Sequence, residues 1–195
     1  PLSLQDEPSL AGDQISWQSD AADARSALDS WFFDVEAGYQ WKVGGDTPLD
    51  YSFATASISL RTPAHIRLDL DSGDHLVVRA QFSLFGDFFV EGPETHYFAF
   101  SAAPSLEYWR EDLETSFFLS VGGGLGFIDS TDVPGGQGQD LTFNWFAKAG
   151  VRKKISEKTY LNAGAMFQHI SNTGLTDPNP GLNTLGPFLG LSVQF

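Results

Sequence analysis

The chain has 195 residues, which is enough for one domain with a sizeable sheet or barrel and too few for two full cores. It contains no cysteine, which rules out disulfides and thiolate metal sites, and no apolar run approaches the roughly 18 residues that a transmembrane helix needs. The 25 acidic and 11 basic residues give a formal charge of -14, which disfavours nucleic acid as a partner because a phosphate-binding surface needs clustered Lys and Arg.

Residues 1–30 are polar and acidic, with Arg25 as their single base, and predict an N-terminal leader segment. From residue 31 onward the sequence changes to aromatic and β-branched runs separated by turn signals, and these runs predict eight strands. The second run is longer than one strand needs, and Pro63 marks a bulge or bend within it. The predicted strands cover residues 31–42, 51–70, 75–90, 96–109, 115–128, 141–152, 160–171 and 184–195.

Apolar and polar residues alternate with a period of two along these runs. In residues 141–152, Phe143 and Trp145 share one face, whereas Lys148 and Arg152 share the other. The apolar faces of the first, third and sixth runs contain no charged residue. This alternation fits two architectures, because a soluble lipocalin-like carrier hides its apolar face inside and an outer-membrane barrel exposes it to lipid.

Three features favour the membrane barrel. Tight turns such as "SEK" alternate with longer loops such as "DSTDVPGGQGQD", as expected for the two rims of a transmembrane barrel. The last strand ends on Phe195 with apolar residues at alternate positions before it, which resembles the C-terminal signal read by the outer-membrane barrel assembly machinery. Aromatic residues lie near predicted strand ends, where membrane interfaces favour them: Trp31, Trp41, Tyr108 and Trp109.

The predicted fold class is therefore all-β, an eight-stranded antiparallel up-and-down transmembrane β-barrel in the bacterial outer membrane. Residues 1–30 form the periplasmic leader and residues 31–195 form the barrel. The polar faces would line a narrow lumen in which opposite charges pair, with these residues inside: Glu36, Arg79, Asp87, Glu107, Lys148 and Arg152.

His169 and Ser171 lie two positions apart at the end of the seventh predicted strand. If the leader and Phe195 are periplasmic, this strand end is extracellular, and both side chains face lipid at the depth of the outer headgroups. Spacing of two puts both on one face with Cα atoms about 6–7 Å apart. An imidazole can then take the serine proton while the oxygen attacks an ester. The alternative is a polar strand end followed by a turn rich in Asn, Pro and Gly.

The stretch "HISNTGLTDPNPGLN" (169–183) resembles the outer-membrane lipid A 3-O-deacylase family, also called acyloxyacyl hydrolases. The strand pattern extends this resemblance loosely over residues 31–195. It implies His169 as base and Ser171 as nucleophile, with Asn172 as support and Gly174 and Asn179 contributing to the oxyanion site. The implied reaction is hydrolysis of the ester-linked acyl chain at position 3 of lipid A, a component of lipopolysaccharide in the outer leaflet, without a metal or other cofactor.

One position departs from the family pattern. The family has an acidic residue fourteen positions after the histidine, and here that residue is Asn183. Pairing around the last hairpin would place Asn183 opposite His169, where an amide can orient the imidazole but cannot stabilise imidazolium as a carboxylate does. Three interpretations follow: a slow enzyme using Asn183, an enzyme in which another acid such as Asp177 substitutes, or a non-catalytic barrel with a structural or interaction role.

Other acidic or glycine-rich stretches have weaker functional interpretations. "DLDSGD" (69–74) has calcium-like spacing but lacks the downstream Glu of an EF-hand loop, so a tight turn is favoured. "GGGLG" (122–126) lacks the Lys-Ser/Thr of a phosphate-binding loop. Asp129, Asp132 and Asp140 could collect a cation, although a solvated loop is the simpler interpretation.

Overall fold

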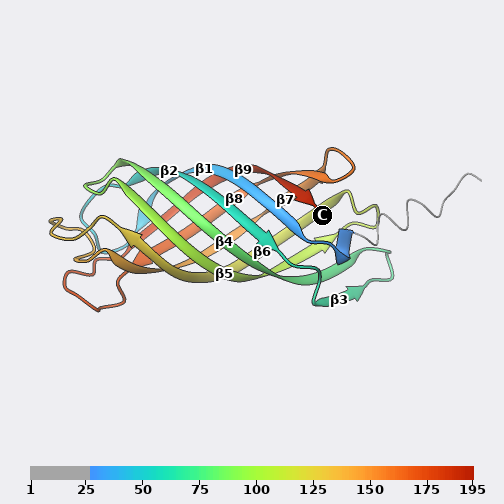
Figure 1. The fold of residues 1–195 in the computed structure, drawn as a ribbon, viewed down its shortest axis with the longest axis horizontal. Helices are drawn as coiled ribbons and strands as arrows, with labels where there is room; N and C mark the ends of the chain where they lie inside the picture. Colours follow the sequence, from blue (N-terminus) through green and yellow to red (C-terminus); the bar gives the residue numbers. More distant parts are fainter. Residues whose placement is uncertain (1–26) are drawn as a thin grey trace, which may run out of the picture.

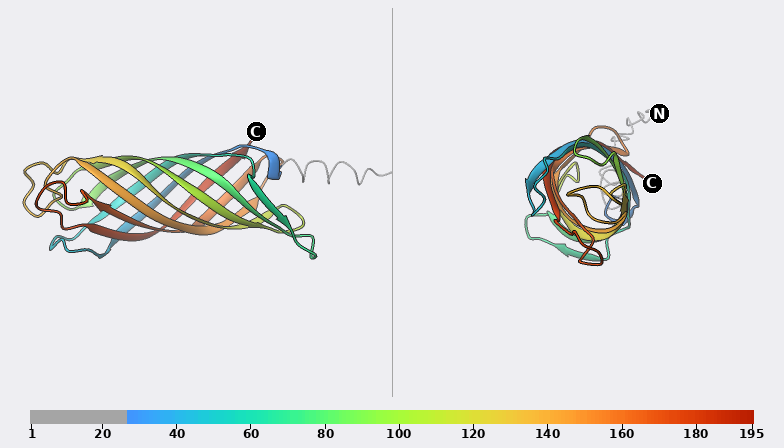
Figure 2. Two further views of the ribbon diagram at one scale, coloured as in Figure 1. Left: turned by 90° about the horizontal axis from the view of Figure 1, so that it is seen from below. Right: turned by 90° about the vertical axis from the view of Figure 1, so that its left-hand side faces the viewer.

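The computed structural model describes residues 27–195, most of which lie in antiparallel strands. Eight long strands close into a cylinder, because each pairs with its neighbours and the first also pairs with the last (Figure 1). Figure 2 shows the closed ring viewed from one end. The predicted eight-stranded barrel is confirmed. Its strands, with one short extra strand, are β1 (Phe32–Gly44), β2 (Ser52–Arg61), β3 (Ile66–Asp69), β4 (His75–Glu91), β5 (His96–Trp109), β6 (Thr115–Ile128), β7 (Leu141–Lys154), β8 (Thr159–Ser171) and β9 (Leu182–Gln194).

The second predicted strand is divided in the structure. β2 ends at Arg61 and β3 begins at Ile66, and between them the backbone N–H groups of Thr62 and His65 still donate to the β4 carbonyls of Ala80 at 3.0 Å and Val78 at 2.8 Å. Pro63 lies in the interruption and has no N–H to donate to a neighbouring strand. All four residues of β3 are exposed, and β3 projects from the cylinder beside β4 (Figure 1). The predicted bend at Pro63 is thus a short interruption that divides the run into two strands.

The alternation of residue types matches the two sides of the barrel wall. Apolar residues such as Phe33, Leu84 and Trp145 point outward, whereas Asp34, Gln81 and other polar residues are buried in the lumen. An apolar outer wall around a polar interior is the pattern of transmembrane barrels. Among residues 27–195 no helix is long and apolar enough to cross a membrane.

Five of the six charged residues predicted to pair in the lumen do so, whereas Asp87 is buried and forms no ion pair within residues 27–195. Glu107 accepts hydrogen bonds from Arg61 at 2.7 Å, from Arg79 at 3.0 Å and from Arg152 at 3.2 Å. Lys148 pairs with Glu36 in the same interior. These contacts satisfy charges that would be costly to bury alone.

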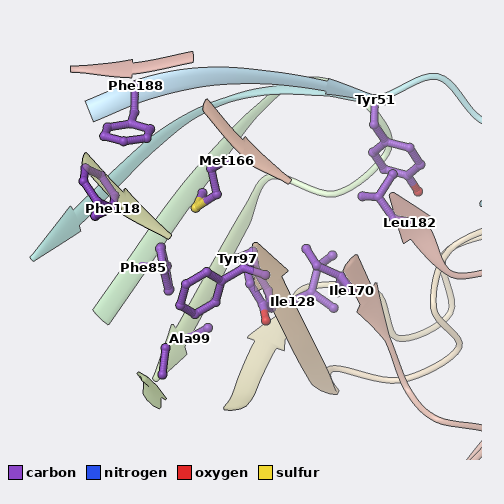
Figure 3. Close-up of a cluster of buried hydrophobic side chains, with 12 residues drawn as sticks. Tyr51, Phe85, Tyr97, Ala99, Phe118, Ile128, Met166, Ile170, Leu182 and Phe188 are labelled. Atoms are coloured by element: carbon purple, nitrogen blue, oxygen red, sulfur yellow. The ribbon is translucent and has the colours of Figure 1, made fainter. Parts of the chain in front are cut away.

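Aromatic and aliphatic side chains fill the rest of the lumen. One cluster runs from Phe118 and Phe188 to Tyr51 near the loop end (Figure 3). A second cluster closes the opposite end, where Trp109 packs against Phe32 and Tyr160. Trp109 is therefore not an interfacial residue, because it occupies an inward position of β5 and donates to Glu107 at 2.8 Å. Trp31 and Trp41 are exposed on the outside, as the prediction required.

The predicted leader lies outside the described residues except for residues 27–30. Ala27 and Leu28 are buried in the second cluster, and the Ala27 carbonyl accepts a hydrogen bond from Arg79 at 2.8 Å. These last residues before β1 close the end of the barrel.

The connections β1–β2, β4–β5, β6–β7 and β8–β9 gather at one end of the cylinder. The C-terminus lies at the other end, together with residue 27 and β3 (Figure 1). The separation of these four loops from both ends of the described chain agrees with the predicted orientation.

Candidate active site

His169 and Ser171 lie at the C-terminal end of β8, where the strand still alternates between inward and outward side chains. Inward residues such as Gln168 and Ile170 are buried, while outward positions such as Leu161 are exposed. By the parity of β8, His169 and Ser171 both fall on the outward row at the loop end of the barrel, where His169 is half-buried and Ser171 is buried. The strand period therefore brings an imidazole and a hydroxyl to the same face of the barrel wall.

Asn183 pairs directly with His169 across β8 and β9, so the predicted register is confirmed. His169 Nδ1 and Asn183 Oδ1 lie 2.6 Å apart. Because Oδ1 only accepts hydrogen bonds, this contact requires a proton on Nδ1, and in the neutral imidazole Nε2 then keeps its lone pair. This is the tautomer that a general base needs.

The other end of the Asn183 amide points away from the imidazole. A Cβ atom added at Gly44 of β1 would lie 3.5 Å from Asn183 Nδ2, so the amide nitrogen is directed toward β1. The Asn183 side chain thus directs Oδ1 toward β8 and Nδ2 toward β1.

Ser171 is 9 % exposed, and its Oγ makes no hydrogen bond within residues 27–195. The spacing along β8 gives a Cα separation of about 6–7 Å from His169, close enough for the two side-chain tips to meet. Catalytic hydrogen bonds are often long before substrate binds and shorten in the complex. Ser171 is thus a hydroxyl at the site with no competing partner.

Asn172 organises the loop that follows Ser171. It is fully buried, and its Nδ2 donates to the carbonyls of Gln137 and Thr176, both at 2.6 Å. Its backbone N–H donates to Asn179 Oδ1 at 2.9 Å. One side chain thus ties the β8–β9 loop to the β6–β7 loop.

Gly174 and Asn179, the two residues expected to contribute to the oxyanion site, differ in whether they have an N–H group that is free to donate. The N–H of Gly174 donates to Asn172 Oδ1 at 2.8 Å, so it is already engaged. Asn179 accepts through Oδ1, and its Nδ2 donates to no group within residues 27–195. The hydrogen bond from the Asn172 N–H holds the Asn179 side chain against the residue that follows Ser171.

Several neighbours of His169 were not anticipated. The Trp145 ring lies 6.1 Å from the His169 ring across β7 and β8. Gly181 has a positive φ of 60°, and a Cβ there would lie 3.3 Å from His169 Cε1. The "NPG" turn signals such a glycine, but its position against the imidazole depends on how the loop folds back. Asp177 is exposed and forms no hydrogen bond with His169, whose Nδ1 is bound to Asn183.

The alternative metal sites do not form among the described residues. No group of three or more His, Cys, Asp and Glu in residues 27–195 is placed to hold a metal ion. Asp129 instead accepts from the backbone of Thr95, and Asp140 accepts from the backbone of Ser130 and Thr131. Asp74, at the end of "DLDSGD", accepts from Tyr108 of β5 and from the Glu111 backbone in the β5–β6 connection.

A family model described as lipid A 3-O-deacylase (PagL) matches residues 16–192. The fold is similar to the crystal structure of the outer membrane enzyme PagL, with a TM-score of 0.54 and 20% identity over 80% of this chain and 97% of that one. It is also similar to Neisserial surface protein A (NspA), with a TM-score of 0.57 and 15% identity over 85% of this chain and 97% of that one. At these identities the two structures show the fold alone. No curated protein matches the sequence.

Proposed function

The chain belongs to the lipid A 3-O-deacylase (PagL) family of the bacterial outer membrane, and from this premise we propose that it hydrolyses the 3-position ester of lipid A. The observation that carries the proposal is the 2.6 Å contact of His169 Nδ1 with Asn183 Oδ1, on the outward face that also carries Ser171. Family membership sets aside the soluble carrier.

The proposed mechanism uses Ser171 as nucleophile and His169 as base. Ser171 Oγ attacks the ester carbonyl as its proton moves to His169 Nε2, and the carbonyl oxygen becomes an oxyanion. Collapse of this intermediate breaks the bond to the sugar oxygen, which takes the proton from Nε2 and leaves as a hydroxyl. Water then attacks the acyl-serine with the same assistance, releasing a fatty acid and restoring Ser171.

Asn179 is the best-placed side chain to stabilise the oxyanion. Its Nδ2 is free to donate and lies beside the residue that follows Ser171. Gly174 can contribute through its N–H only by sharing the donor with Asn172 Oδ1. Removing one oxyanion donor from a serine protease costs about 10²–10³ in turnover.

The position of the site suits a substrate that is itself part of the membrane. His169 and Ser171 end an outward row whose lower members include Leu161 and Phe167. Such a row contacts acyl chains, while the strand end lies at the level of the headgroups. An ester of lipid A, which joins an acyl chain to a sugar, would lie at this boundary.

Because Asn183 replaces the acidic residue of the family, we expect the enzyme to be slow. The amide supports the productive tautomer but supplies no negative charge opposite the imidazolium that forms during the reaction. We propose that turnover is low for this reason.

The proposal is tested by mass spectrometry of lipid A after incubation with the purified protein in detergent micelles. We expect loss of the acyl chain at position 3 with the native chain and no loss with Ser171→Ala, which removes the nucleophile and leaves the barrel intact. Intact lipid A with both proteins would contradict the proposal.

A non-catalytic barrel with a structural or interaction role is the second candidate, and Asn183 is the observation that favours it. If the native chain and Asn183→Glu both leave lipid A intact, this second candidate is the one supported.

We also propose that the C-terminal residues are read by the barrel assembly machinery. Phe195 is 64% exposed and follows outward residues of β9, with its N–H bonded to the Trp31 carbonyl at 3.0 Å. Phe195→Ala is expected to reduce the amount of folded protein in the membrane.

A further inference from the structure

Strand β3 extends the barrel wall at the end opposite the four loops. It pairs with the first residues of β4 and, within residues 27–195, with no other strand, so one of its edges is open. β3 therefore lies outside the closed ring of eight strands. It leans away from the cylinder in Figure 1 and in the left view of Figure 2.

The side chains of β3 alternate in character. Ile66 and Leu68 are on one face, where they are 63% and 55% exposed. Arg67 and Asp69 are on the other face, where Arg67 Nε donates to Asp69 Oδ1 at 2.6 Å. His75 Nδ1 lies 2.6 Å from the same oxygen. One face of β3 is thus apolar, and the other is polar with its charges paired.

The apolar face of β3 continues the outer wall of the barrel. Ile66 pairs with Val78 and Leu68 pairs with Leu76, and both partners are outward residues of β4. Across β5 and β6 the paired outward residues are also uncharged, so two rows run from β6 to β3 without an ionised side chain. The rows are Ile66, Val78, Leu106 and Leu119, and Leu68, Leu76, Tyr108 and Phe117.

This wall is the surface through which the barrel contacts lipid, because the chain belongs to an outer-membrane family and apolar outer walls of such barrels face acyl chains. Tyr108 gives the depth of the row that contains Leu68. Its ring is half-buried, and its hydroxyl donates to Asp74 in the β3–β4 turn. Tyrosines with an apolar ring and a hydrogen-bonded tip are enriched at the membrane–water interface. The Leu68 row therefore lies at the level of the headgroups.

The open edge of β3 places its backbone at the same level. The Leu70 N–H donates to the Asp74 carbonyl at 2.9 Å, and in an antiparallel pair alternate residues turn their N–H and C=O groups toward the partner. The main chain of Leu68 then faces β4, and that of Arg67 and Asp69 faces the open edge. Unpaired backbone groups cannot lie in hydrocarbon, but water and headgroups can satisfy them.

We propose that β3 is a membrane-surface element that rests on the phospholipid leaflet at this end of the barrel, with Ile66 and Leu68 inserted between headgroups and acyl chains. The predicted orientation makes this the periplasmic leaflet. Amphipathic helices bind membranes with their apolar face about 5–10 Å deep, and an amphipathic strand offers lipid the same two faces. The continuity of the β3 face with the lipid-facing wall identifies lipid as the occupant.

This contact would hold one side of the barrel rim at a fixed depth. β4, which carries β3, and β8, which carries His169 and Ser171, are four strands apart in the ring of eight. The contact therefore lies on the side of the barrel opposite the candidate active site. The inference does not depend on the proposed esterase activity.

The test measures how deep each β3 side chain lies in the membrane. The chain contains no cysteine, so one cysteine at a time can be introduced and labelled with the fluorophore bimane. The labelled full chains are reconstituted in phosphatidylcholine vesicles. Brominated acyl chains serve as the lipid quencher, and iodide on both sides of the membrane serves as the aqueous quencher. The variants are Ile66→Cys, Arg67→Cys, Leu68→Cys and Asp69→Cys.

Two further variants calibrate the measurement. Leu84→Cys lies on the outward row of β4 and reports a side chain in lipid. Glu157→Cys lies in the β7–β8 turn, at the same end of the barrel as β3, and reports a side chain in water.

We expect brominated lipid to reduce the emission at residues 66 and 68 nearly as much as at residue 84. The emission at residues 67 and 69 should resemble that at residue 157, and iodide should give the reverse pattern. The two outward positions are independent, so one suffices if the other variant does not fold.

Iodide quenching at residues 66 and 68 equal to that at residue 157 would overturn the proposal, and would leave the apolar face for a protein partner. Strong lipid quenching at all four positions would also overturn it, because the open edge would then lie in hydrocarbon and not among headgroups.

Discussion

At the residue scale, Asn183 differs from the amide variants of serine proteases in what it offers the imidazole. In those enzymes the acid-to-amide change costs about 10⁴ in turnover, because the histidine is held in the wrong tautomer. Here Asn183 presents Oδ1 to His169 Nδ1 at 2.6 Å, and its Nδ2 is directed toward Gly44. The productive tautomer is therefore favoured, and only the charge is missing.

Asn183→Asp should accordingly raise turnover of lipid A deacylation. The change keeps the shape of the side chain and adds the charge that stabilises imidazolium. The increase in turnover should be at most about 10⁴-fold. Asn183→Leu should lower turnover, because it removes the hydrogen bond to Nδ1. The kcat of the three proteins on one lipid A preparation measures this, and a kcat that is unchanged in Asn183→Asp would contradict the role assigned to Asn183.

The motif residues could be predicted because strand geometry places them. A period of two puts His169 and Ser171 on one face, and antiparallel pairing around the last hairpin puts Asn183 opposite His169. The contacts of Gly181 with His169 and of Gln137 with Asn172 could not be predicted, because they depend on how loops distant in sequence fold together.

At the element scale, the β6–β7 loop is held by its own acidic residue. Asp140 Oδ1 accepts from the backbone N–H groups of Ser130 at 3.0 Å and Thr131 at 2.8 Å, which closes the loop at its base. The loop then carries Gln137 to Asn172. Order at residues 129–140 is thereby linked to order at the candidate active site.

This closure predicts a pH dependence of the loop. The Thr131 hydroxyl and, next, its backbone N–H hold the pKa of Asp140 below its usual value of 3.8, because both favour the ionised carboxylate. Since the folded pKa is the lower one, the stabilisation is present above about pH 4 and is lost as the pH falls through the folded pKa.

Hydrogen exchange of residues 129–140, corrected for the intrinsic rate, should show protection falling below about pH 4. Asp140→Asn should show reduced protection at higher pH and a smaller further loss on acidification. Equal pH profiles for the two proteins would show that Asp140 does not close the loop.

Strand positions could be predicted from alternation, and the errors have local causes. The run across residues 51–70 alternates beyond Pro63, so the sequence alone could not show where pairing stops. Trp109 lies at a strand end like an interfacial residue, but the parity of β5 turns it inward to Glu107. Parity within a strand is thus a better guide to exposure than distance from its end.

At the scale of the whole molecule, several buried charges in the lumen form one network of ion pairs. Arg61 bridges Asp34 and Glu107 at 2.7 Å each, and Arg79 and Arg152 also reach Glu107. Removal of one member leaves buried charges without partners, which is more costly than the pair is stabilising.

Glu107→Gln should therefore destabilise the barrel by about 3–5 kcal/mol, the range for breaking a buried ion pair by removing one partner. Urea unfolding in micelles measures the difference. Glu157→Gln, at an exposed position in the β7–β8 turn, makes the same change and should have little effect. Similar losses in both variants would indicate that net charge, and not the Glu107 network, determines stability.

We propose that Ser171 is a nucleophile activated by His169 on the outer face of the barrel. An alkyl fluorophosphonate in the detergent micelle reacts with such a serine, and peptide mass spectrometry locates the adduct. We predict one adduct per chain on Ser171, with labelling strongly reduced in His169→Ala. Absence of an adduct at Ser171, or equal labelling in His169→Ala, would contradict the claim.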